Sequence, residues 1–494
     1  MSGSRRAFFR HAALAGAGVL GCPAIVRSAT TAATAPDARP RHLIHLVADG
    51  TSIGTLTLGD HFSRLHRKTG LRWLDLCRQP AAHTALVNMR SLNSWVTDSA
   101  AASSSWSTGS RVVNGVLNQL PDGTNLRPLC SLAAEAGWKR GLVTTTEITH
   151  ATPAGFAANT DNRGTAEHIA LQYLERKIDV LLGGGRKYFE PTRRKDKRDL
   201  HAEFARAGYS VLQTASQLAA APRGQPCLGT FASGHLPFTI DHQASDELRK
   251  TVPTLADMTR AALRQLEAAG HFILQVEGGR VDHGAHACDI ATAVRDLVAF
   301  DDALAICLEF QQRVPDTLLV VTTDHGTANP GLNGTGSGYK ETIPLFTNIL
   351  KATRSFESLE PDLVKNPSAA HLQRLLKEAT GYNAPDAKIA LVLAAFQKKG
   401  QALYSHMNSV EAHLGQLLAN HLGVGWTGTS HTADFVPLVA FGPGASRFTG
   451  FLQNTDVFRI YTDLAQIDYR NPEAPLLGEC QPTADEVETR AAWV

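Results

Sequence analysis

The sequence predicts an α/β protein: a three-layer α/β/α sandwich around a mainly parallel sheet, with a mostly helical insertion. Near-continuous apolar runs of strand length end in Gly or Asp, which is typical of parallel strands buried on both faces. Helical patterns separate these runs, and the repeated alternation favours helices on both faces of one sheet. One long stretch, 331–423, breaks the alternation, because it has helical patterns but few strand signals.

The predicted elements can be placed in chain order. Strands are expected at 42–50, 141–146, 180–185, 272–279, 318–326 and 436–444. The helices between them include 255–269 and 289–310, and those of the insertion are 369–379, 387–398 and 410–421. The apolar character of the six runs favours buried, parallel strands throughout.

The N-terminal segment has the layout of an export signal. Arg5 and Arg6 precede a weakly apolar run at 12–20, as in a twin-arginine signal, so we expect a periplasmic or extracellular protein. The apolar run is too short to cross a bilayer and no second one follows, so no transmembrane anchor is expected. The predicted organisation is a signal peptide at 1–29, a linker at 30–41 and the main domain at 42–494.

Charge and cysteine content exclude some partners and sites. The 494 residues carry a net charge of +2, and the basic cluster at 193–198 is short and contains an acid. Nucleic acid is therefore not an expected partner. The seven cysteines include no CxxC pair, so a cysteine-ligated zinc site is not expected.

Carboxylates and histidines lie beside the ends of several predicted strands. Ligands of open parallel sheets bind beyond the carboxyl ends of the strands, so these side chains indicate a shared metal site. They are Asp49, Glu277, Asp282, Asp324, His325 and, before the last strand, His431. Histidine with carboxylate suits zinc, whereas an oxygen-only set such as Asp49, Thr152 and Glu277 suits magnesium.

Two local spacings sharpen this interpretation. Asp282 and His286 are four residues apart, so on a helical turn they face the same way and can hold one ion. Asp324 and His325 are adjacent, which on a strand would point them to opposite faces. Both can reach one metal only at a strand end, where Gly326 loosens the backbone.

Ser99 begins a helical pattern of small residues, SAAASSSWST. As structural residues, Asp98 or Ser99 would cap this helix. As a functional residue, Ser99 would place its hydroxyl at a helix N-terminus, where the dipole and free N–H groups favour an anion. Taken alone the segment favours the cap, and the surrounding metal-ligand pattern favours the functional role.

Several long motifs, in the right order, resemble the alkaline phosphatase family. The resemblance runs from about residue 42 to 330 and resumes near Gly425. The nucleophile segment of that family is similar to VTDSAAASSSWSTG at 96–109. The other matching segments are HLVADG at 45–50, TTEITHATPAGFAANTDNR at 145–163, DVLLGGGRKYF at 179–189, VEGGRVDHGAH at 276–286 and TTDHG at 322–326.

The resemblance implies a role for each site residue. One zinc would be held by Asp282, His286 and His431, and a second by Asp49, Asp324 and His325, with Ser99 beside it as nucleophile. One magnesium would be held by Asp49, Thr152 and Glu277. Arg163 would bind phosphoryl oxygens and be steadied by Asp98. The two variable positions near the metals fall at His150 and His283, a pair that resembles vertebrate-type members.

The activity implied is hydrolysis of small phosphate monoesters through a phosphoserine intermediate, at two Zn²⁺ and one Mg²⁺. A phosphodiesterase of the same superfamily is one alternative, and a non-catalytic phosphate- or zinc-binding protein is another. The family also implies a homodimer as one option. The 331–423 insertion does not resemble the β-rich crown of vertebrate members.

Overall fold

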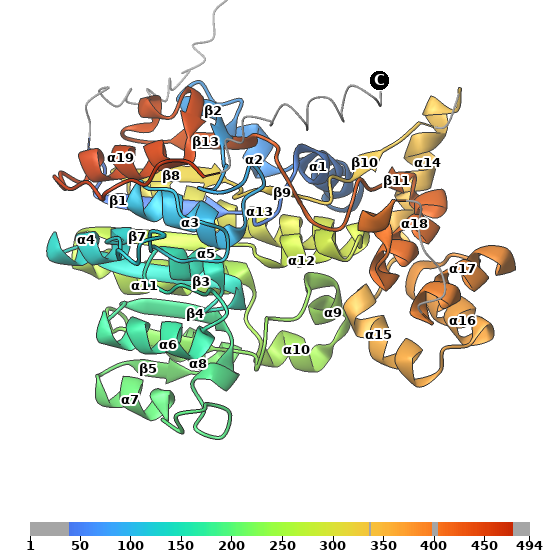
Figure 1. Ribbon diagram of the computed structural model, residues 1–494, viewed down its shortest axis with the longest axis horizontal. Helices are drawn as coiled ribbons and strands as arrows, with labels where there is room; N and C mark the ends of the chain where they lie inside the picture. Colours follow the sequence, from blue (N-terminus) through green and yellow to red (C-terminus); the bar gives the residue numbers. More distant parts are fainter. Residues whose placement is uncertain (1–38, 335–336, 398–403, 478–494) are drawn as a thin grey trace, which may run out of the picture. The chain divides into compact units, whose positions relative to one another are not determined.

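The computed structural model describes residues 39–334, 337–397 and 404–477 (Figure 1). Its central feature, within these ranges, is a ten-stranded sheet that is mainly parallel. Its strands, in spatial order, are β14 (Gly450–Gln453), β2 (Ala82–Asn88), β13 (Val436–Phe441), β8 (Thr317–Thr322), β1 (His42–Val47), β7 (Phe272–Glu277), β3 (Lys139–Glu147), β4 (Val180–Gly184), β6 (Cys227–Thr230) and β5 (Ser210–Leu212). The predicted fold class is confirmed.

Two apolar layers, one on each face of the sheet, make the structure a three-layer sandwich. Alternate residues of β1 enter different layers: Ile44 and Leu46 join one, and Leu43 and Val47 join the other. This is the two-residue period of a strand buried on both faces, and it explains why the predicted strands are continuously apolar.

Helices on both faces complete the layers (Figure 1). The first layer is covered by α1 (Ile53–Arg67), α2 (Arg72–Leu76), α11 (Leu255–Leu266) and α13 (Ile290–Arg313). The second layer is covered by α3 (Ser99–Thr108), α4 (Leu129–Glu135), α5 (Ala151–Gly155), α6 (Ala166–Glu175), α7 (Leu200–Arg206) and α19 (Asn454–Leu464). Shorter helices α8 (Ala215–Ala220), α9 (Thr239–Ala244), α10 (Asp246–Thr251) and α12 (Arg280–His286) connect these elements.

The direction of one strand differs from the prediction. The run 436–444 was expected to be parallel, but β13 is antiparallel to both of its neighbours, β8 and β2. Just before it, β12 (His431–Thr432) pairs with β9 (Gly326–Thr327), which follows β8. The chain therefore re-enters the sheet at the edge where β8 ends, and it must run in the opposite direction.

The segment 331–423 forms the expected helical insertion (Figure 1). It leaves and returns through a short antiparallel ladder of β10 (Gly331–Leu332) and β11 (Val424–Gly425). Its helices are α14 (Thr342–Thr347), α15 (Phe356–Lys365), α16 (Ala369–Thr380), α17 (Asp386–Phe396) and α18 (Val410–Leu422). Apolar residues of these helices, such as Phe356 and Leu414, join the same apolar layer as α13, so the insertion shares the core of the sheet domain.

The predicted signal peptide and most of the predicted linker lie outside the described residues. Within the described part of the chain, no helix is both long enough and apolar enough to cross a membrane. The cysteines at 77, 130, 227, 288 and 307 are free thiols.

A close approach of α3 and α5 generates the first prediction. A Cβ added at Gly155 on α5 would lie 2.4 Å from Ser103 Oγ on α3, so Gly155→Ala should push the two helices apart. We expect a loss of about 1–3 kcal/mol in the free energy of unfolding, measured by urea denaturation. Gly331→Ala is the matched control, because its added Cβ would have no neighbour nearer than 3.8 Å. Equal stability of the two variants would contradict the argument.

Candidate active site

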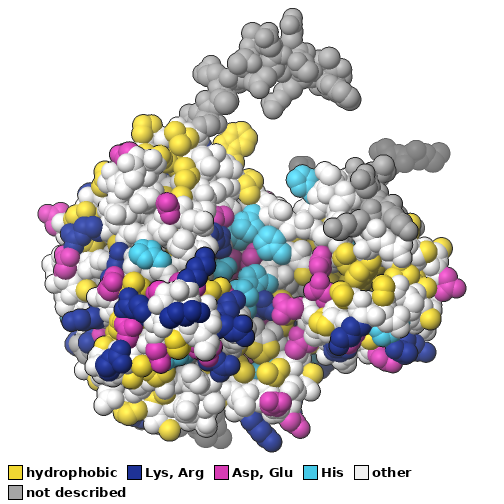
Figure 2. All heavy atoms as spheres, turned by 60° about the horizontal axis from the view of Figure 1, so that its bottom comes forward, with side chains coloured by type: hydrophobic (Ala, Val, Ile, Leu, Met, Phe, Trp, Pro, Cys, Tyr) yellow, Lys and Arg dark blue, Asp and Glu magenta, His cyan; other side chains and the backbone are white. Residues whose placement is uncertain are grey.

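The register of three neighbouring strands brings the predicted residues together at one edge of the sheet. Val47, at the end of β1, is level with Glu277 on β7 and with Thr322 on β8. Asp49 follows β1, and Asp324 with His325 follows β8, so these side chains leave the sheet side by side. Figure 2 shows a group of histidine side chains in a hollow of the surface, with Lys, Arg and acidic side chains around it.

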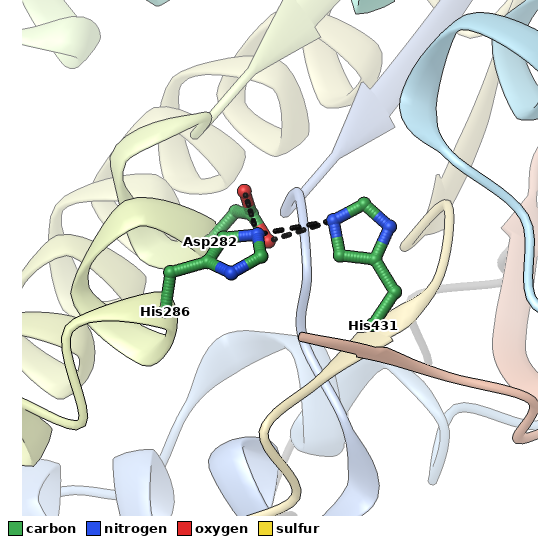
Figure 3. A group of neighbouring side chains, drawn as sticks. All are labelled: Asp282, His286 and His431. Atoms are coloured by element: carbon green, nitrogen blue, oxygen red, sulfur yellow. Dashed lines mark hydrogen bonds and ion pairs between the residues drawn. The ribbon is translucent and has the colours of Figure 1, made fainter. Parts of the chain in front are cut away.

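A first cluster joins Asp282, His286 and His431, the predicted ligands of one zinc (Figure 3). Asp282 and His286 both lie on α12, as their spacing predicts, with His286 Nε2 at 3.3 Å from Asp282 Oδ2. His431 comes from β12, and its Nε2 lies 3.8 Å from Asp282 Oδ1. The antiparallel direction of β13 is what brings His431, which precedes that strand, to this edge.

The histidines of this cluster are oriented as metal ligands usually are. His286 Nδ1 donates to the carbonyl of Thr429 at 2.6 Å, and His431 Nδ1 donates to the carbonyl of Thr97 at 2.9 Å. Each ring therefore turns Nε2 to the cluster, and the outer hydrogen bond fixes that tautomer. Burial lowers the pKa of His286, but Asp282 and the Thr429 carbonyl together raise it by more, so that the net pKa is about 9. The cluster thus attracts positive charge.

A second cluster joins Asp49, Asp324 and His325, and all three side chains are fully buried. His325 Nε2 lies 3.5 Å from Asp49 Oδ1 and 3.3 Å from Asp324 Oδ2. Ser99 Oγ lies 3.2 Å from the same Nε2. The hydroxyl that was predicted to be the nucleophile is thus in direct contact with this cluster.

A third cluster joins Asp49, His150 and Glu277. Thr152, the third predicted magnesium ligand, is next to them, with its Oγ1 at 3.4 Å from Asp49 Oδ2. His150 was predicted only as a residue near the metals, but it belongs to the cluster itself, because its Nδ1 is 4.0 Å from Glu277 Oε1. His150 precedes α5 as its N-cap residue, so the turn into that helix places it beside Thr152.

The carboxylates of the site repel one another. Burial raises the pKa of Asp49, and the charges of Asp324 and Asp282 raise that pKa further. Burial also raises the pKa of Glu277 to about 7, and burial with the charge of Asp282 raises the pKa of Asp324 to about 6. Cations placed among them would relieve this repulsion.

Unpartnered atoms support the same conclusion. Asp49 Oδ1, Glu277 Oε1, Asp324 Oδ2 and His150 Nδ1 are buried and have no hydrogen-bond partner. Buried polar atoms are rarely left this way, and each of the four belongs to a type that ligates metal ions. The residues therefore fit the implied metals.

Arg163 and Asp98 are placed beside Ser99. Asp98 is the N-cap residue of α3: its Oδ1 accepts from the backbone N–H of Ala101 at 2.9 Å, and Ser99 begins the helix. Asp98 Oδ2 accepts from Arg163 Nη1 at 2.8 Å, and Arg163 Nη2 donates to His150 Nε2 at 3.2 Å. The capping role and the functional placement of Ser99 are therefore combined: Asp98 caps, and Ser99 contacts the cluster.

Sequence reasoning missed several residues of the site. Thr327 was not among the predicted site residues, but its Oγ1 donates to Asp282 Oδ1 at 2.6 Å. His235 was not singled out, yet its ring contacts those of His283 and His150 at 4.5 and 5.8 Å between centroids. Arg280, within the VEGGRVDHGAH motif, donates to His283 Nδ1 at 2.7 Å. Only the motif around Arg280 carried a signal.

Comparison with known proteins gives the same assignment. The family model described as alkaline phosphatase matches residues 40–467. Alkaline phosphatase 3 of Bacillus subtilis is 33% identical over 372 residues, spanning 73% of this chain and 75% of that protein. Streptomycin-6-phosphate phosphatase of Streptomyces griseus is 31% identical over 365 residues, or 65% of this chain and 81% of that protein.

Solved structures agree with the sequence relatives. The crystal structure of Thermus thermophilus alkaline phosphatase matches with a TM-score of 0.82 and 34% identity, covering 94% of this chain and 99% of that one. A cold-active alkaline phosphatase from a psychrophilic Shewanella matches with a TM-score of 0.72 and 26% identity, covering 86% of this chain and 99% of that one. The chain belongs to the alkaline phosphatase family, and it is a phosphomonoester hydrolase.

Proposed function

We propose that the chain hydrolyses phosphate monoesters in two steps through a phosphoserine formed on Ser99. Asp282, His286 and His431 would hold one zinc ion, and Asp49, Asp324 and His325 a second. Asp49, Thr152 and Glu277 would hold a magnesium ion, with His150 beside it. The observation that carries the proposal is the contact of Ser99 Oγ with His325 Nε2 at 3.2 Å, inside a buried set of metal-ligand side chains.

In the first step Ser99 Oγ forms a bond to phosphorus, and the bond from phosphorus to the ester oxygen breaks. The proton of the Ser99 hydroxyl passes to water, and the alcohol leaves with a proton taken up from water. Ser99 suits this role because it begins α3, where the helix dipole favours negative charge on its oxygen. Bound metal ions supply positive charge that makes hydroxyl groups stronger nucleophiles near neutral pH and stabilises the leaving oxygen.

In the second step a water oxygen attacks phosphorus and the bond to Ser99 Oγ breaks. The attacking water gives up a proton as inorganic phosphate leaves, and the Ser99 oxygen takes up a proton to become a hydroxyl again. Two displacements, each with inversion at phosphorus, give net retention.

Arg163 would bind the phosphoryl group in both steps. Its guanidinium is a planar fork that suits two oxygens of a dianionic phosphate. Asp98 and His150 each accept a hydrogen bond from it, so its orientation is fixed before substrate arrives. A diester has one fewer free oxygen and one fewer charge, and it would gain less from this residue.

The same proposal covers the organisation of the chain. Residues 1–29 would act as a twin-arginine export signal, 30–41 as a linker, and 331–423 as a helical insertion into the catalytic domain at 42–494. The enzyme would act outside the cytoplasm on small phosphomonoesters, and it would form a homodimer as its relatives' family implies.

The proposed mechanism makes Ser99 and metal ions indispensable. Hydrolysis of p-nitrophenyl phosphate should be lost on EDTA treatment and return with zinc and magnesium, and Ser99→Ala should lose most of kcat. Ser105→Ala is a matched control, because this hydroxyl lies on the same helix but donates to the helix's own backbone, at the carbonyl of Ala101. A metal-loaded protein that cleaves bis-p-nitrophenyl phosphate but not the monoester would contradict the proposal in favour of a phosphodiesterase.

Arg163 should distinguish monoesters from diesters. Arg163→Ala removes charged hydrogen bonds to the phosphoryl group, so we expect kcat/KM for p-nitrophenyl phosphate to fall about 10–100-fold. Any slow cleavage of bis-p-nitrophenyl phosphate should fall less. Arg193→Ala removes an exposed arginine that makes none of these contacts and should change neither rate. An equal loss on both substrates would contradict the assigned role.

The stability of the metal-free protein should depend on pH. The folded-state pKa values of Glu277 and Asp324, about 7 and about 6, lie above those of the unfolded chain. Between pH 4 and 7 the folded apoprotein keeps protons that the unfolded chain has lost. Relative to the metal-loaded protein, the apoprotein should therefore lose stability as pH rises, by about 1.4 kcal/mol per pH unit for each proton kept.

This dependence can be measured by urea unfolding at pH 5 and pH 8, with and without metals. The metal-loaded protein is the control, because bound cations replace those protons. Stability curves that stay parallel for the two forms would contradict the metal assignment.

A further inference from the structure

The helical insertion reaches the active site through an ion pair between Glu357 and Arg280. Glu357, near the start of α15, accepts hydrogen bonds from Arg280 Nη2 on both of its carboxylate oxygens, at 2.8 and 2.7 Å. The Arg280 side chain is 3% exposed, whereas that of Glu357 is 61% exposed. The exposed carboxylate of Glu357 on the insertion thus neutralises the guanidinium of Arg280, which is buried beside the candidate active site.

The start of α15 is fixed in place. The backbone N–H of Ser355 donates to Asp241 Oδ1 at 3.1 Å, and that of Phe356 donates to Asp289 Oδ2 at 2.9 Å. Asp241 belongs to α9, and Asp289 is the N-cap residue of α13. The first turn of α15 is therefore tied to two helices of the sheet domain, and Glu357 can reach only a narrow region.

Arg280 is held from two further directions. Its guanidinium carbon lies 3.5 Å from the centre of the Phe238 ring, a cation–π contact. Its Nη1 donates to His283 Nδ1 at 2.7 Å. Arg280 also begins α12, the helix that carries Asp282 and His286.

The contact with Arg280 determines which nitrogen of His283 carries the proton. A guanidinium has only donors, so His283 Nδ1 must accept and, in the neutral ring, Nε2 carries the hydrogen. Among the described residues, His283 Nε2 has no hydrogen-bond partner. The ring lies 5.7 Å from that of His150, whose Nε2 accepts from Arg163. His150 therefore contacts both the His283 ring and the proposed phosphoryl-binding arginine.

We propose that Glu357 is a positioning residue for catalysis. Acting through Arg280, it holds His283 as an Nε2–H donor for an oxygen in the active site, either of the phosphoryl group or of a water bound to it. This inference rests on the proposed function. Loss of the Glu357 carboxylate frees Arg280 to turn away from His283, and the ring can then rotate or exchange its tautomer. The insertion thereby controls a hydrogen-bond donor of the catalytic domain.

A double-mutant cycle on the metal-loaded enzyme tests the coupling. Glu357→Ala should lower kcat/KM for p-nitrophenyl phosphate about tenfold, within the range for residues of one hydrogen-bond network. In the His283→Ala background the same change should have less than about a twofold effect. Glu360→Ala removes an exposed carboxylate from the same helix and should leave activity unchanged. Equal effects of Glu357→Ala in both backgrounds would overturn the proposal.

A second measurement does not depend on turnover. In protein labelled with ¹⁵N-histidine, the His283 signals, assigned by their absence in His283→Gln, should show the Nε2–H tautomer. Glu357→Ala should shift this population, and Glu357→Gln, which keeps an acceptor oxygen, should restore it in part. An unchanged tautomer in Glu357→Ala would overturn the inference even in a fully active enzyme. A wild type inactive on monoesters would instead refute the proposed function, while the tautomer still tests the link to Glu357.

Discussion

The burial of four carboxylates in one site, Asp49, Glu277, Asp282 and Asp324, constrains the rest of the centre. In the described part of the chain none of them forms an ion pair with Lys or Arg, and their charged contacts are all with histidines. Such a set repels itself unless cations are present. The histidine orientations and the unpartnered oxygens agree with the same requirement, because each leaves an electron pair free to bind a metal ion.

The sheet supplies the rigid frame that holds these four carboxylates close together. Three strands in register, β7, β1 and β8, deliver their terminal carboxylates to one edge, and the antiparallel β13 returns His431 to it. The helices α3 and α5 then bring Ser99 and Thr152 to the same place through the contact of Ser103 with the Thr152 carbonyl. Side chains from so many segments can meet only because buried strands and packed helices leave little freedom.

The insertion is part of this frame rather than an appendage. Its helices share an apolar layer with α13, and α15 is tied to Asp241 and Asp289 by hydrogen bonds. Glu357 then reaches Arg280, which begins the helix that carries two metal ligands. A surface helix can thereby influence the geometry of a buried site, because the groups between them are charged and closely packed.

The sequence alone determined the fold class, and it predicted the candidate site residues that the structure brings together, because local signals and motifs carry them. The spacing of Asp282 and His286 is a helical period, and apolar runs mark buried strands. The edge strand β14 and its neighbour β2 escaped prediction because they are partly exposed and less apolar. Only the tertiary structure decided the direction of β13, the contact of His150 with Glu277, and the chain of contacts from Glu357 to His283. These depend on how distant segments pack, and no local pattern records that.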